Sequence, residues 1–175
     1  MKLVTVMDNQ GGENHCLLTE HGLSFYAEFS TLKVLFDFGP GKDTLTNARK
    51  LDIPLGDIAY AVGSHGHYDH AGGYPAFVEA GLKAPLVTGK GYFLEKYGVK
   101  DIRATYLGTG FDESYLQKNG ISHMECDGFL QLAEDVFLVG NFKRCHPFET
   151  IPERFKLRHG EGWVSDRFDD EICLV

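Results

Sequence analysis

The sequence has little that would suit a membrane, a nucleic acid or an oxidising compartment. No apolar run approaches the length of a membrane span, and the apolar stretch in the first residues, MKLVTVMDNQ, is too short for a signal peptide. Lys and Arg number 17 against 25 Asp and Glu, and the formal net charge of −8 argues against a broad nucleic-acid footprint. The four cysteines (Cys16, Cys126, Cys145 and Cys173) form no CxxC pair. We therefore expect a cytoplasmic protein with reduced cysteines that binds neither nucleic acid nor membrane.

The residues that are abundant indicate a folded domain with many turns. Apolar residues make up 43% of the 175 positions and aromatic residues 13%, which is a globular composition and not a disordered one. The 21 glycines favour tight turns over long helices. A chain of this length fits one domain, and we expect residues 1–175 to form it.

Strand and helix patterns alternate along the first two thirds of the chain, which indicates an α/β fold. From about residue 120 the expected elements are short strands, and residues 140–170 are polar and poorly periodic, as in a long excursion over the surface or over a site. The long polar loop 9–22 is a candidate binding loop. Strands are expected over 2–8, 24–30, 31–39, 57–64, 84–89, 102–108, 121–126, 129–140 and 171–175, and helices over 42–53, 71–82 and 90–98.

The stretch SHGHYDHAGG, residues 64–73, places three histidines and an aspartate within six positions. It follows a buried strand, at whose carboxyl end α/β proteins tend to place ligand sites. His65 and His67 are two apart in an extended segment and can converge on one ion, while Asp69 and His70 can converge on a neighbouring one. Imidazole and carboxylate ligands suit Zn²⁺, with Fe or Mn as alternatives. A hydroxide shared by two such ions is a strong nucleophile at neutral pH.

A histidine-rich surface turn is the alternative interpretation of this cluster, because isolated histidines are usually structural or solvated. Four potential ligands at this spacing, directly behind a buried strand, favour a metal site.

The cluster also carries a resemblance. SHGHYDHAGG matches the HxHxDH signature of the metallo-β-lactamase superfamily, and FDFGP resembles the Asp-x-Gly turn that precedes it there, with Asp37 bracing the metal-bearing loop. More narrowly, ENHCLLTEHGLSFYAEF, LFDFGPGKDTLTNARKLDI and FETIPERFKL resemble the branch of dihydropterin-type synthases and related metal-dependent hydrolases. The resemblance implies a four-layer αββα sandwich and a dinuclear centre, often zinc. It implies that His65 and His67 bind the first metal, and Asp69 and His70 the second.

The chain departs from that pattern in one respect. In the branch it resembles, a third histidine follows a strand like EICLV in a Gly-Cys-Ser-His-like segment, whereas this sequence stops at Val175. The resemblance therefore extends only to the amino-terminal part of the fold, and two ligands per metal would leave each ion under-coordinated. An exposed apolar sheet face and a free EICLV edge would follow. We expect a homo-oligomer, or a second chain that supplies the carboxy-terminal half.

Two residues outside the cluster are candidates for substrate binding. His21 ends the first loop, next to Glu20, and a solvated turn is an equally good account of both. Glu149 in the stretch FET is a candidate contact for a substrate or for water. His146 and His159 are possible additional metal ligands, although surface positions suit them better, and His123 is expected to be a bystander.

Two charged stretches near the end of the sequence have open interpretations. The acidic stretch SDRFDDE (Asp166, Asp169, Asp170 and Glu171) lacks the glycine and the spacing of a calcium loop, so we expect solvated carboxylates. A basic group could receive a phosphate or carboxylate, or could be part of a mixed-charge surface. It consists of Lys143, Arg144, Arg154, Lys156 and Arg158.

Together these patterns predict a metal-dependent hydrolase or related transferase. A metal-bound hydroxide would attack an ester, a phosphoester or a related group of a small anionic substrate, and Asp69 would orient that hydroxide as the catalytic residue. The alternative is a catalytically incomplete metal-binding fragment that acts as half of an assembly.

Overall fold

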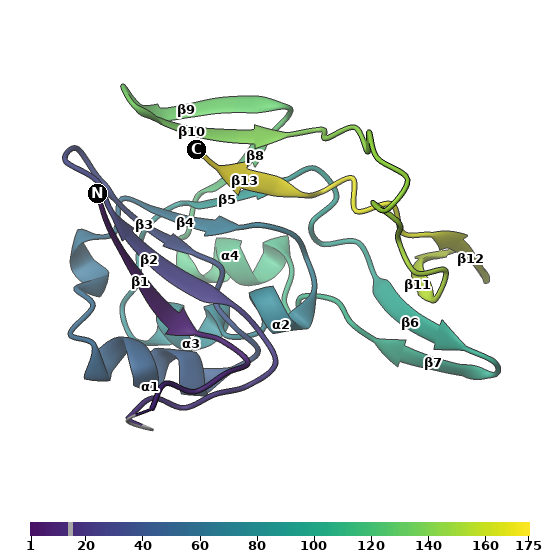
Figure 1. Ribbon diagram of the computed structural model, residues 1–175, viewed down its shortest axis with the longest axis horizontal. Coiled ribbons are helices and arrows are strands. Elements are labelled where there is room, and N and C mark those ends of the chain that lie inside the picture. The colour runs from purple at the N-terminus through teal and green to yellow at the C-terminus, as the bar shows by residue number, and fades with distance from the viewer. Residues whose placement is uncertain (14–15) are drawn as a thin grey trace.

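The computed structural model describes residues 1–13 and 16–175, and it contains three sheets with one group of helices (Figure 1). Residues 14 and 15, which fall in the predicted binding loop 9–22, lie outside the described residues. The largest sheet has six strands in the order β1-β2-β3-β4-β5-β8. Its strands are β1 Lys2–Met7, β2 Ser24–Glu28, β3 Lys33–Phe36, β4 Tyr60–Gly63, β5 Leu86–Gly89 and β8 His123–Cys126.

This sheet is antiparallel at one side and parallel at the other. β1, β2 and β3 pair antiparallel, whereas β3, β4, β5 and β8 pair parallel, so β4 lies inside the sheet with a parallel neighbour on each side. The carboxyl end of β4 delivers the histidine cluster, as the sequence predicts. Parallel strands require crossover connections, which the helices supply.

The helices cover one face of the six-stranded sheet (Figure 1). Apolar side chains of α1, α3 and α4, such as Leu45, Phe77 and Leu116, pack against Leu35 and Leu86 of the sheet. The helices are α1 Lys42–Lys50, α2 Tyr68–Ala71, α3 Tyr74–Glu79 and α4 Glu113–Asn119, with a 3₁₀ turn at Leu55–Asp57. In the described part of the chain, none of them is long and apolar enough to cross a membrane.

A second, three-stranded sheet packs on the opposite face (Figure 1). It has the order β13-β10-β9 and is antiparallel throughout, with β9 Phe129–Ala133, β10 Val136–Gly140 and β13 Ile172–Leu174. Leu138 and Ile172 of this sheet meet Val34, Val62 and Val87 of the large sheet in a second core. Helices, sheet and sheet are three of the four layers predicted; no helix from the described residues contributes to this second core.

A third, four-stranded sheet projects to one side of the sandwich (Figure 1). Its order is β12-β11-β6-β7, and all neighbours are antiparallel. The strands are β6 Lys96–Lys100, β7 Arg103–Tyr106, β11 Phe155–His159 and β12 Gly162–Ser165. Two hairpins far apart in the sequence therefore meet through the pairing of β6 with β11.

This sheet corrects two expectations. The helix predicted over 90–98 is wrong: a turn through Gly91, whose φ is +88°, leads into β6, and Tyr97 pairs with Tyr106 and Lys156. The poorly periodic stretch 140–170, expected to be a long excursion, also contains two strands that were not predicted, β11 and β12. In both cases, pairing between residues about sixty positions apart overrides the local pattern.

Candidate metal centre

The histidine cluster lies in the tight connection between β4 and α2. His65 follows the strand directly, His67 precedes α2, and Asp69 and His70 lie on that single helical turn. Gly66 passes so close to the carbonyl oxygen of Tyr92 that a Cβ atom there would collide with it. Only glycine lets the loop approach that backbone, so the spacing of the two flanking histidines is built into the fold.

Asp37, fully buried directly after β3, anchors this loop through its carboxylate. Its carboxylate accepts hydrogen bonds from the Ser64 amide (2.7 Å) and the Ser64 hydroxyl (2.8 Å). It also accepts one from Nδ1 of His70 (2.7 Å). The bracing that the resemblance implied for Asp37 is thus a set of three hydrogen bonds, two to the start of the loop and one to its end.

These contacts fix which nitrogen of two histidines is available to a ligand. A carboxylate only accepts, so Nδ1 of His70 carries the proton and Nε2 is left with its lone pair when the ring is neutral. The Ser64 hydroxyl donates its proton to Asp37, so its oxygen accepts a hydrogen bond from Nδ1 of His65 at 3.1 Å. Both rings therefore leave Nε2 available to a ligand. A metal-binding histidine is commonly oriented in this way by an acceptor that receives its other N–H.

Burial and neighbouring charges act differently on these two imidazoles. Burial, helped by the nearby His70, His67 and Lys96, lowers the pKa of His65 well below its usual range, so this ring is neutral. Burial also acts to lower the pKa of His70, but the hydrogen bond and charge of Asp37 outweigh it, and the net pKa is raised.

The three imidazoles lie against one another. The ring centre of His65 is 4.3 Å from that of His70 and 4.9 Å from that of His67. Phe168 packs against two of them, with its ring centre 5.5 Å from that of His65 and 4.9 Å from that of His67. A neighbouring aromatic ring of this kind limits the access of water to the cluster.

His67 carries an unsatisfied polar atom. Its Nε2 is buried and makes no hydrogen bond, and it lies 3.6 Å from Oδ2 of Asp166, which is equally buried and unpartnered. Burial acts to raise the pKa of Asp166, but the adjacent His67 and the amide of Phe168 outweigh it, and the pKa is lowered. Two buried polar atoms without partners are costly unless something binds them.

The lack of a hydrogen-bond partner at Nε2 of His67 tests whether a metal ion suits the cluster. The donor types fit a first-row divalent metal, and this orphaned atom is one that an ion would satisfy. Within residues 1–13 and 16–175, however, no three His, Cys, Asp or Glu side chains are already gathered as a group that could hold a metal ion. The fit is therefore one of donor chemistry and not of a preformed cage.

Asp69 lies at the open side of the cluster and meets His21 there. Its Oδ2 is 3.7 Å from Nε2 of His70 and 3.4 Å from Nε2 of His21. The side-chain amide of Asn9 donates to Nδ1 of His21 (3.2 Å), and its oxygen accepts from the amide of Gly22 (2.9 Å). The first loop thus brings His21 beside the cluster, where it lines the same cavity as His67 and Asp69.

Three comparisons with known proteins identify the family and fold of this chain. The sequence profile of the metallo-beta-lactamase superfamily matches residues 20–161. The chain belongs to the metallo-β-lactamase superfamily. The crystal structure of Tm1679, described as a metal-dependent hydrolase of the β-lactamase superfamily, is similar with a TM-score of 0.73 and 25% sequence identity, over 98% of this chain and 59% of that one.

Two curated relatives come from Methanocaldococcus jannaschii. An uncharacterized protein is 27% identical over 158 residues, covering 89% of this chain and 59% of its own length. A 7,8-dihydropterin-6-methyl-4-(beta-D-ribofuranosyl)-aminobenzene-5′-phosphate synthase is 32% identical over 187 aligned positions, covering 100% of this chain and 63% of its own length. The chain thus spans about three fifths of the length of the relatives it matches.

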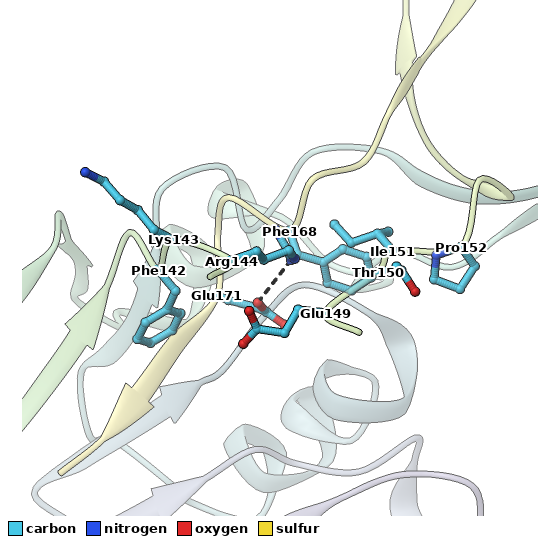
Figure 2. A pocket seen from close by; sticks show the side chains of 9 residues that line it. All are labelled: Phe142, Lys143, Arg144, Glu149, Thr150, Ile151, Pro152, Phe168 and Glu171. Carbon is cyan, nitrogen blue, oxygen red and sulfur yellow. Dashed lines mark ion pairs between the residues drawn. The ribbon is translucent and has the colours of Figure 1, made fainter. Parts of the chain in front are cut away.

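Glu149 lies in a different place in this metallo-β-lactamase domain. Its Oε2 accepts from the amides of Cys145 (2.6 Å) and His146 (2.7 Å), which folds the 143–150 loop on itself. It lines a cavity of about 430 Å³ with Arg144, Phe168 and Glu171, and an ion pair of 3.7 Å joins Arg144 to Glu171 (Figure 2). Phe168 borders both this cavity and the histidines.

The other candidate histidines lie away from β4. Nε2 of His123 contacts the Thr88 hydroxyl at 2.9 Å, between β8 and β5, which agrees with its expected role as a bystander. His146 stacks on Phe148 in the exposed loop, with ring centres 5.2 Å apart, and His159 is exposed at the end of β11.

Sequence reasoning missed a buried ion pair behind the cluster. Nζ of Lys96 and Oδ2 of Asp170 are 2.9 Å apart, and both residues are buried. The same oxygen of Asp170 accepts from the amide of Gly66 at 2.7 Å, and Lys96 also donates to the carbonyl of Tyr92 (3.2 Å). The pair therefore holds the histidine-bearing loop at Gly66, while Asp37 holds it at Ser64 and His70.

The expectation that the stretch SDRFDDE is solvated is thus wrong for two of its members. Asp166 and Asp170 are each 3% exposed, because His67 in one case and Lys96 with the amide of Gly66 in the other lie against them. An apolar residue two positions after Asp170, Ile172, was the available signal, since it anchors the segment in the core.

We predict that Lys96→Met destabilises the protein by about 3–5 kcal/mol, because it leaves the carboxylate of Asp170 buried without its counter-charge. Lys33→Met is the matched control: it breaks the exposed pair with Asp57 and is expected to shift the unfolding midpoint far less. Urea unfolding midpoints measure both, and the double variant Lys96→Met/Asp170→Asn recovers part of the loss. Equal effects of Lys96→Met and Lys33→Met would contradict the role of the buried pair.

Proposed function

We propose that this chain is a metal-dependent hydrolase or related transferase that acts on a small anionic substrate. Membership of the superfamily supports hydrolase chemistry, and the observation that carries the proposal is the buried, unpartnered Nε2 of His67, on a ring that packs against His65, which in turn packs against His70. Those three imidazoles and Asp69 would hold one or two divalent ions, zinc first, with Fe or Mn as alternatives. A divalent metal there would supply Lewis acidity and lower the pKa of a water molecule.

The residues of the chain divide the remaining work. Asp69, at the open side of the cluster, is the carboxylate that orients the attacking water and accepts its proton. His21, whose Nδ1 accepts from the Asn9 amide, directs Nε2 at Asp69 and lines the cavity as a contact for the substrate. Phe168 shields the imidazoles from bulk water on their other side. Glu149 stays a candidate substrate contact only for a ligand that reaches past Phe168.

We also propose a cytoplasmic location. Cys126, Cys145 and Cys173 are free thiols, and Cys145 is exposed, which is the usage expected in a reducing compartment.

The metal proposal predicts that His67→Ala lowers the affinity for zinc by at least about a hundredfold, since it removes a direct ligand and losing a supporting partner already costs up to that much. His159→Ala, at an exposed histidine on β11, is expected to leave the affinity unchanged. Competition with a chromogenic chelator measures both. Hydrolysis of bis-p-nitrophenyl phosphate should stop on chelation and return with zinc; equal affinities in the two variants would refute the assignment.

One observation favours the second candidate, a fragment that acts as half of an assembly. A cavity of about 450 Å³ runs between β13 and the β1–β3 side of the large sheet. Its lining is apolar, and Met1, Leu3 and Val175 are 86%, 57% and 63% exposed. Exposed apolar surface beside an edge strand is suited to association. We propose a second copy, or a chain that supplies the carboxy-terminal half of the fold, as its partner.

This candidate predicts that the wild-type chain associates, with itself or with such a partner, and that Leu3→Glu abolishes the association. Ile102→Glu is the control, because Ile102 is fully exposed at the β6–β7 turn, far from the cavity in the fold. Sedimentation velocity over a range of concentrations, with and without the separate partner chain, gives the readout. A wild-type chain that stays monomeric in both conditions would sink the idea.

A further inference from the structure

The cavity beside the cluster has a second end, away from the histidines. It has a volume of about 350 Å³ and is lined at one end by His21, His67 and Asp69. Its other walls come from the β6–β7 hairpin and the start of β11, including Val99, Leu107 and Phe155. Lys100 and Arg154 line it there, and of its described lining residues Asp69 alone carries a carboxylate. The cavity therefore has a reactive end, an apolar middle and a cationic end.

We propose that Lys100 and Arg154 bind an oxyanion, so that the substrate is a small molecule with a planar or apolar body ending in a phosphate or carboxylate group. This inference rests on the proposed function for the reactive end of the cavity. It adds which part of the substrate is charged and which residues recognise it.

Lys100 and Arg154 have no acidic partner. Among the described residues, the ion pairs of Lys and Arg involve Lys33, Lys96 and Arg144, and neither Lys100 nor Arg154 takes part in one. The other basic residues of this sheet, Arg103, Lys156 and Arg158, do not line the cavity. Lys156 donates to the Ser165 hydroxyl and Arg158 lies over Trp163 at 4.9 Å. The neighbouring Glu153 does not line the cavity.

The backbone fixes where the two cations stand. Lys100 ends β6, where it pairs with Arg103 across the hairpin, and the amide of Val99 donates to the carbonyl of Arg154 at 2.8 Å. The amide of Tyr68, beside His67, donates to the carbonyl of Leu107 at 2.8 Å and ties the hairpin to the cluster. The cationic end is thus held at a set place relative to the reactive end.

An aromatic path connects the two ends. The guanidinium of Arg154 lies over the ring of Phe155 at 4.8 Å, and that ring is 5.4 Å from the ring of His67. Stacking holds the guanidinium plane while leaving its edge free for a forked pair of hydrogen bonds to an oxyanion. In a chain of net charge −8, such a pair of unneutralised cations also selects for anions locally.

Isothermal titration of the full chain with phenyl phosphate, benzoate and phenol tests this proposal. The titrations use chelator-treated protein, so a metal ion contributes nothing to the binding. We expect phenyl phosphate or benzoate to bind more tightly than phenol. Arg154→Gln and Lys100→Gln should each weaken binding of the anion roughly three- to tenfold and leave phenol unchanged. Lys156→Gln and Arg158→Gln, on β11 but outside the cavity, are the matched controls and should bind as the wild type does.

The anion site is overturned if phenyl phosphate and benzoate both bind no better than phenol, if Arg154→Gln and Lys100→Gln bind as the wild type does, or if the two control variants lose as much. The readout is independent of the proposed function. If anion binding depends on Arg154 but the chain hydrolyses no ester with any metal, the anion site stands and the proposed hydrolase function is wrong. Hydrolysis without Arg154-dependent binding would do the reverse.

Discussion

The carboxylate of Asp37 accepts hydrogen bonds from both ends of the loop that carries the histidines, and the rest of the site depends on that arrangement. It is fully buried directly after β3, an interior strand of the large sheet, and accepts hydrogen bonds from the amide and hydroxyl of Ser64 and from Nδ1 of His70. A buried carboxylate is tolerated only when such donors surround it. Because all of its donors belong to the loop, the hydrogen bonds that satisfy Asp37 also orient the imidazoles: that of His70 directly and that of His65 through Ser64.

Residues from much later in the chain also contact the histidine-bearing loop. Asp170 accepts from Gly66 and pairs with Lys96, while Asp166 meets His67 and Phe168 lies over the imidazoles. The segment before β13 therefore closes over the loop that β4 delivers. Two buried carboxylates from one segment, each against a different part of the loop, connect the packing of the second sheet to the geometry of the cluster.

The features that could be predicted from the sequence are those that short stretches of residues determine. The buried strand before His65, the spacing of the histidines and the α/β alternation are all contained in short stretches, and the structure has each of them. Residues 90–98 misled because Phe93, Leu94 and Tyr97 have helical spacing, whereas pairing with β11 decides the strand. Asp166 and Asp170 read as solvated because Lys96 and the loop at Gly66 and His67, which bury them, lie 70 or more positions earlier in the sequence.

Long-range ¹H–¹⁵N correlation spectra of the metal-free protein test the central claim most directly. They report which imidazole nitrogen carries the proton, and are recorded above the raised pKa of His70 so that the ring is neutral. His65 and His70 are expected to be Nδ1-protonated tautomers, with unprotonated Nε2 atoms whose resonances shift when zinc is added. Nε2-protonated rings, or Nε2 resonances that zinc leaves unmoved, would contradict that claim.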